Sequence, residues 1–157
     1  MKSPVIQSLF KIAQVELIYR NKVKAADRPK VTNSKDAYKL FLSTWDENKI
    51  ELVESFQIML LDRRNTCLGI SEISTGGVNS CIADPKIIFA TALKSRACNL
   101  ILAHNHPSGD IVPSNADMMV SRKIKQGAGL LDIQVLDHLI VTPDQYYSFA
   151  DEGKLIP

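Results

Sequence analysis

The spacing of apolar residues along the chain predicts five strands. They cover residues 15–19, 55–62, 67–73, 100–103 and 133–141. In the first of these segments Val15, Leu17 and Tyr19 occupy alternate positions, which is typical of a strand with one buried face. Residues 100–103 instead form a continuous apolar run, which indicates a central strand covered on both faces. The polar turn at residues 63–65 predicts a hairpin between the second and third strands.

Helices are predicted where a capping residue precedes apolar residues spaced three or four apart. Asn33 begins one such helix, and Asp84 with Pro85 begins a second that ends near Ala97. A third covers residues 114–128. The apolar faces of the first two helices are Ala37, Leu40, Phe41, Trp45, Ile88, Ala92 and Leu93. A short helix through Leu9 and Phe10 and a short polar-capped segment at residues 147–151 complete the expected elements.

These elements predict one α/β domain, a mixed sheet flanked by helices. A length of 157 residues is near the usual size of a single domain. The sequence contains no internal repeat, low-complexity tract or Gly/Ser-rich linker at which a second domain would begin. We therefore expect the domain to cover residues 15–157, with residues 1–14 as an N-terminal extension.

Composition narrows the partners that the chain is expected to have. No apolar run reaches the roughly 18 residues of a membrane-spanning helix, and the N-terminus lacks a signal-peptide core, so we expect a cytoplasmic protein without a membrane partner. A net charge of +2 and a basic cluster at residues 20–30 predict at most weak nucleic-acid binding. Cys67, Cys81 and Cys98 show no C-x-x-C spacing and are expected to be small buried hydrophobes.

The residues best suited to chemistry follow the central strand. In extended backbone His104 and His106 point to the same side, and Asp117 lies one turn inside the next helix. Two imidazoles and one carboxylate form a three-ligand site for Zn²⁺ with the fourth position open, as catalytic zinc sites have. A carboxylate must then accept the proton of the attacking water, and Glu54, at the start of a strand, is the candidate, with Glu47 and Glu51 nearby.

This arrangement resembles a known family. The spacing His104-x-His106, seven residues, Ser114-x-x-Asp117, with Glu54 upstream, is similar to the JAMM (MPN/JAB) signature of zinc isopeptidases and their bacterial relatives. The longer string from His104 to Gly109, with Leu136-Asp137-His138-Leu139-Ile140 later, resembles the RadC family from about Val15 onward.

The resemblance implies a specific chemistry. It implies a JAMM domain with cytidine-deaminase-like layering, His104, His106 and Asp117 as zinc ligands, and Glu54 rather than its neighbours as the acid/base. Ser114 would donate a hydrogen bond to the oxyanion of the tetrahedral intermediate. The expected activity is zinc-dependent hydrolysis of a peptide or isopeptide amide bond in a peptide or protein substrate, with water activated by zinc and Glu54.

Other interpretations stay open at the level of sequence. Ser114 and Asp117 also match a helix-capping pair. His138 is expected to be a buried histidine satisfied by a carboxylate rather than a second metal ligand. No Gly-rich helix-hairpin-helix segment, which many RadC-like proteins carry, precedes Val15. The alternative functions are a nucleic-acid-associated protein of repair or mobile elements, and a metal-binding scaffold without turnover.

Overall fold

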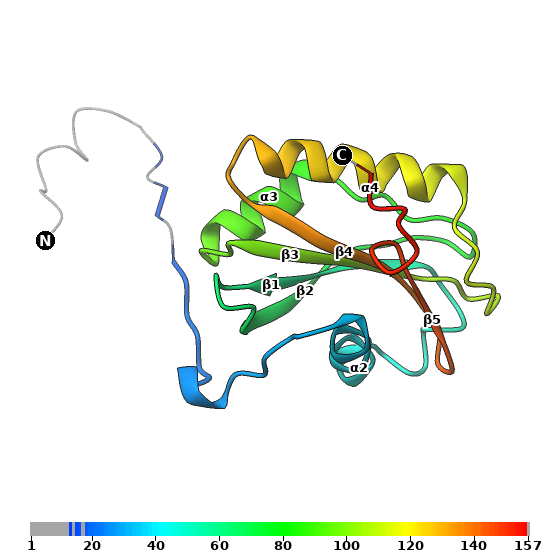
Figure 1. The fold of residues 1–157 in the computed structure, drawn as a ribbon, viewed down its shortest axis with the longest axis horizontal. Helices are drawn as coiled ribbons and strands as arrows, with labels where there is room; N and C mark the ends of the chain where they lie inside the picture. Colours follow the sequence, from blue (N-terminus) through cyan, green and yellow to red (C-terminus); the bar gives the residue numbers. More distant parts are fainter. Residues whose placement is uncertain (1–12, 14, 17, 157) are drawn as a thin grey trace, which may run out of the picture.

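A mixed five-stranded sheet forms the centre of the protein, in a computed structural model that describes residues 13, 15–16 and 18–156 (Figure 1). The strands are β1 (Ser55–Leu61), β2 (Cys67–Thr75), β3 (Asn99–Asn105), β4 (Gln134–Val141) and β5 (Tyr146–Ser148). Their order in the sheet is β2-β1-β3-β4-β5. The β3–β4 pair is parallel and the other pairs are antiparallel.

Helices cover both faces of the sheet, which gives three layers. Helix α2 (Ser34–Thr44) packs on one face, and α3 (Pro85–Lys94) with α4 (Asn115–Gly129) on the other (Figure 1). Strand β3 contributes to both cores, because successive side chains in a strand point to opposite faces. Leu100 and Leu102 belong to the core beneath α3 and α4, and Ile101 and Ala103 to the core beneath α2. The predicted α/β class and mixed sheet are therefore confirmed.

The helices begin at the predicted capping residues. The side chains of Asn33, Asp84 and Ser114 accept the backbone N–H of Asp36, Lys86 and Asp117, respectively. Helix α4 then connects the parallel strands β3 and β4, so its N-terminus lies at the C-terminal end of β3. The main chain thus brings the predicted ligands of β3 and α4 together at the C-terminal end of β3.

The strand predicted at residues 15–19 is wrong. Val15 is 90% exposed and Tyr19 38% exposed, and the described residues of this segment have no strand partner. Alternation creates a strand only where a segment pairs with a sheet edge, and among the residues described before α2 the isolated β-bridge is the one that Lys30 forms with Thr66. Leu17 and the short helix expected through Leu9 and Phe10 lie outside the described residues.

Three other details differ from the sequence predictions. Leu93 is 55% exposed, because it lies on the outer side of α3 near the end of the helix. Cys98 is exposed and Cys81 is half-buried, so only Cys67 matches the expectation of a buried thiol. The C-terminal segment includes a strand, β5, which pairs with β4. The described part of the chain contains no helix long and apolar enough to cross a membrane.

Candidate metal centre

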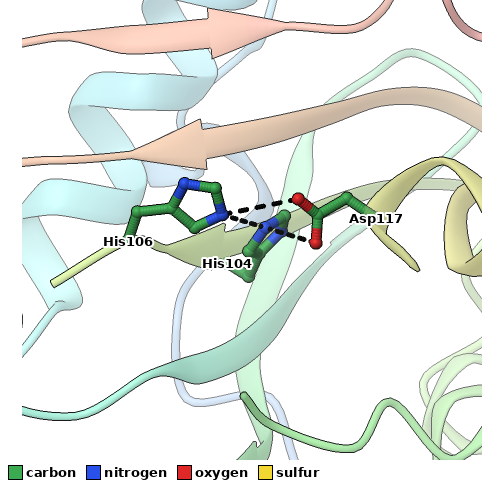
Figure 2. A group of neighbouring side chains, drawn as sticks. All are labelled: His104, His106 and Asp117. Atoms are coloured by element: carbon green, nitrogen blue, oxygen red, sulfur yellow. Dashed lines mark hydrogen bonds and ion pairs between the residues drawn. The ribbon is translucent and has the colours of Figure 1, made fainter. Parts of the chain in front are cut away.

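His104, His106 and Asp117 meet where β3 ends and α4 begins (Figure 2). His104 is the next-to-last residue of β3, His106 follows the strand, and Asp117 lies in the first turn of α4. Their side chains point toward one another in Figure 2. The alternation of the extended backbone carries both histidines to the same face of the sheet, as their spacing predicts.

The three side chains have the geometry of a metal-binding group. His104 Nε2 lies 3.0 Å from His106 Nε2 and 3.2 Å from Asp117 Oδ1. His106 Nε2 lies 3.4 Å from Asp117 Oδ2. One ligand atom from each residue lies within 4.8 Å of the other two. Two imidazole nitrogens and one carboxylate oxygen around one point are a donor set that suits Zn²⁺.

Hydrogen bonds orient both imidazole rings. His106 Nδ1 lies 2.6 Å from the carbonyl oxygen of Asp110, which can only accept, so Nδ1 carries a proton and, when the ring is neutral, the lone pair is on Nε2. His104 Nδ1 lies 2.8 Å from His138 Nε2. Both rings therefore place Nε2 at the centre of the group, as a metal requires.

The electrostatics of the group are coupled. Hydrogen bonding to Asp117 raises the pKa of His106, although burial acts in the opposite direction. Burial alone would raise the pKa of Asp117, but hydrogen bonds from His104 and His106 outweigh it and hold that pKa well below its usual range. Burial, reinforced by the nearby His104, lowers the pKa of His138 well below its usual value. Asp117 is therefore present as a carboxylate.

Ser114 fixes the carboxylate of Asp117 through a capping box. Ser114 Oγ accepts the backbone N–H of Asp117 at 3.1 Å, and Asp117 Oδ2 accepts the backbone N–H of Ser114 at 2.7 Å. The capping interpretation of this pair is confirmed. Because the serine oxygen accepts in this contact, its hydroxyl hydrogen is free to donate elsewhere.

Glu54 is buried immediately before β1. Its backbone N–H donates to Gly77 O at 2.9 Å, and its carbonyl accepts from Gly76 N–H at 2.8 Å, so it extends the pairing of β1 with β2. Gly76 is required there, since a Cβ at this position would lie 2.0 Å from the carbonyl oxygen of Ser80. On the other side of β1, Phe56 pairs with His104, and continuing that register places Glu54 beside His106.

A cleft of about 490 Å³ brings the candidate residues to one surface. It is lined by Glu51, Glu54, Val78, Asn79, Ser80, Cys81, His106, Pro107, Ser108, Ser114, Ala116, Asp117 and Val120. Glu54, His104 and Asp117 also line a smaller adjoining cavity. Glu51 thus shares the cleft with Glu54, whereas Glu47 is exposed and does not line it.

Two residues near the centre carried no chemical prediction at the level of sequence. Asn105 stands between the two histidines in sequence, and its fully buried side chain, which the alternation of the strand points to the opposite face, binds the backbone of residues 50–55. Cys81 Sγ lies 3.7 Å from Glu54 Oε1. Burial, with the Glu54 carboxylate adding to it, raises the pKa of this thiol to about 12, so it stays protonated. The sequence contains one signal that could have identified Asn105, its position within the string from His104 to Gly109. It contains no such signal for Cys81.

The expected carboxylate partner of His138 is wrong. The imidazole instead contacts His104, and the carboxylate of Asp137 accepts from Ser148 Oγ at 2.6 Å and from Ala150 N at 3.0 Å. The reason is the alternation of strand β4, which points consecutive side chains to opposite faces of the sheet. The Asp137 carboxylate therefore accepts the backbone N–H of His138 at 2.7 Å but does not contact its imidazole.

Comparison with known proteins gives consistent similarities. Residues 31–154 match the family described as RadC-like JAB domain. The chain is 40% identical to a UPF0758 protein of Flavobacterium johnsoniae over 124 residues, 79% of this chain and 53% of the relative. It is 36% identical to a UPF0758 protein of Moorella thermoacetica over 143 residues, 91% of this chain and 61% of the relative. The chain thus spans between half and two thirds of the length of these curated relatives.

Proposed function

This chain belongs to the RadC-like JAB domain family, and on that premise we propose that it is a zinc-dependent hydrolase of peptide or isopeptide amide bonds. One observation carries the proposal. His104, His106 and Asp117 surround one point, and the buried Glu54 lines the same cleft as His106 and Asp117. Three protein ligands with an acidic group beside them are the composition of a catalytic rather than a structural zinc site.

The residues of the chain divide the work of amide hydrolysis. Bound zinc would supply Lewis-acid polarisation at the open face of the three ligands. The carboxylate of Glu54 accepts a proton from the attacking water and later passes it to the departing amine nitrogen. The hydroxyl of Ser114, whose oxygen accepts from Asp117 N–H, donates its own hydrogen toward the oxyanion that develops on the substrate carbonyl.

The charge of the cleft favours a polypeptide over a nucleic acid. Glu51, Glu54 and Asp117 line it, and its described lining contains no lysine or arginine. Binding to phosphates depends on such cations. The basic residues at 20–30 belong to the N-terminal segment and do not line the cleft. A nucleic-acid-associated role is therefore the weaker alternative, and a metal-binding scaffold without turnover is the other.

Elemental analysis of purified protein tests the metal. We expect about one zinc per chain in the wild type, and strong loss of zinc from folded His104→Ala and Asp117→Ala proteins, since each variant removes one of three ligands. Glu47→Ala changes an exposed carboxylate outside the cleft and serves as the control with unchanged zinc content. Unchanged zinc in both ligand variants would refute the assignment.

A panel of peptide and isopeptide substrates tests the activity. Zinc-loaded wild type is expected to hydrolyse at least one bond of the panel, and protein stripped of zinc by a chelator is not. If the wild type binds zinc at the expected site but cleaves none of the panel, the scaffold becomes the better description.

A further inference from the structure

His138 is the one imidazole of this region that the proposed function does not use. The residue is completely buried beneath helix α4, with its ring stacked on Phe149 at 4.6 Å between centroids and packed edge-on against Phe56 at 5.7 Å. Within the described part of the chain, its polar side-chain contact is His104, and its Nδ1 has no hydrogen-bond partner. An imidazole placed in such apolar surroundings needs an explanation, since buried polar atoms are usually paired.

The contact between the two rings contains one shared proton. His104 Nδ1 and His138 Nε2 lie 2.8 Å apart, so one of these nitrogens donates and the other accepts. A neutral imidazole carries a single N–H. If the proton is on His104 Nδ1, then His104 Nε2 has a free lone pair directed at the centre of the three ligands. If it is on His138 Nε2, then His104 must carry its own proton on Nε2, which faces Asp117 Oδ1 at 3.2 Å.

We propose that His138 is a positioning residue: it accepts the Nδ1 proton of His104 and thereby holds the Nε2 lone pair of His104 toward zinc. The inference rests on the proposed zinc site. His138 does not touch the metal position itself, since it lies outside the group formed by His104, His106 and Asp117.

The second histidine ligand shows what such an acceptor does. His106 Nδ1 is held by the carbonyl oxygen of Asp110. This acceptor belongs to the main chain, so a side-chain substitution does not remove it. His104 is the more buried of the two ligands, and in the described structure its Nδ1 contacts His138 and no carbonyl or carboxylate. The orientation of His104 therefore depends on one replaceable side chain, and outer groups of this kind typically change metal affinity about 10- to 100-fold.

If His138 only packs against Phe56 and Phe149, replacing it with another aromatic residue should leave zinc affinity unchanged. A pair of variants separates this packing role from the positioning role. His138→Phe keeps an aromatic ring between Phe56 and Phe149 but removes the acceptor. His138→Gln removes the ring but places an amide oxygen near the position of Nε2. The zinc dissociation constant of each full-length folded protein is measured by competition with a chromophoric chelator, and urea unfolding reports stability separately.

We expect His138→Phe to bind zinc about 10- to 100-fold more weakly than the wild type, and His138→Gln to recover most of the affinity. Equal zinc affinity of His138→Phe and the wild type would overturn the positioning role and leave the zinc site intact. A wild type that binds no zinc would instead overturn the proposed function.

Nitrogen-15 NMR of the zinc-loaded wild type gives a second measurement that needs no variant to fold. The proposal requires the His104 ring to be protonated at Nδ1 and not at Nε2. A His104 ring protonated at Nε2 in the zinc-loaded protein would contradict it, whatever the stability of the variants.

Discussion

The side-chain oxygen of Asn105 lies 2.7 Å from the backbone nitrogen of Ser55, which joins the end of β3 to the start of β1. The side-chain nitrogen of Asn105 donates to the carbonyl oxygens of Ile50 and Val53 at 2.6 and 2.9 Å. One buried amide thus holds the segment that leads into Glu54. Because Asn105 is also the residue between His104 and His106 in the chain, its amide ties the segment that leads into Glu54 to the strand end that carries the two histidines.

Asn105→Ala should destabilise the protein by on the order of 3 kcal/mol, since it leaves three backbone groups without their partner in the interior. It should also lower hydrolysis more than zinc content, because the ligands remain while Glu54 loses its support. Urea unfolding and elemental analysis measure the two effects. Asn99→Ala, at the opposite and half-buried end of β3, is the control and should leave zinc and activity unchanged. An Asn105→Ala protein with wild-type stability would contradict this account.

Glu54→Gln should stay folded and retain zinc, yet lose hydrolysis by about 100-fold or more, because glutamine keeps the shape but cannot accept the proton. Turnover of the zinc-loaded variant on whichever substrate the wild type cleaves gives the measurement. Glu51→Gln is the matched control, as this glutamate lines the same cleft without being the proposed base. If the Glu51 variant loses activity and the Glu54 variant does not, the two roles are exchanged.

Ser114→Gly separates the two roles of the serine. Glycine at an N-cap costs only a few tenths of a kcal/mol relative to serine, so helix α4 and its zinc ligand should persist. The hydroxyl is lost, and the rate of hydrolysis should fall by about 100-fold if it stabilises the oxyanion. Thermal unfolding measures the loss of the cap, and turnover measures the loss of the oxyanion contact. Unchanged turnover would leave Ser114 with its capping role alone.

The pH dependence of the zinc-free protein should reveal the pairing of His106 with Asp117. The pKa of His106 is raised from 6.5, so its contribution to stability is complete below about 6.5 and is lost as pH rises through the raised value. The pKa of Asp117 is lowered from 3.8, so its contribution is present above about 3.8 and is lost as pH falls further. Between these limits the pair stabilises the fold.

The difference in unfolding free energy between wild type and His106→Gln, measured without zinc, should therefore be largest at mildly acidic pH and shrink toward alkaline pH. Zinc affinity should follow the opposite trend and increase with pH, because His106 must lose its proton to bind the metal. A stability difference that grows toward alkaline pH in the zinc-free protein would show that the pair is not formed as described.

Sequence alone determined where the three α-helices begin and the direction of the two histidine ligands, because these depend on local physics. Caps at Asn33, Asp84 and Ser114 act within one helical turn, and all three begin helices in the structure. The period of two in extended backbone places His104 and His106 on one side in any fold that contains that strand. The capping pair at Ser114 likewise places Asp117 in the first turn of the next helix.

Tertiary structure decided everything that depends on which segments pair and in what register. Val15, Leu17 and Tyr19 occupy alternate positions as in a strand, yet the described residues of 15–19 belong to no strand of the sheet. The placement of Glu54 beside His106 follows from the pairing of Phe56 with His104, and the contact of His138 with His104 from the parallel pairing of β3 with β4. These contacts join residues 34 or more positions apart, and no local preference of the backbone reaches that far.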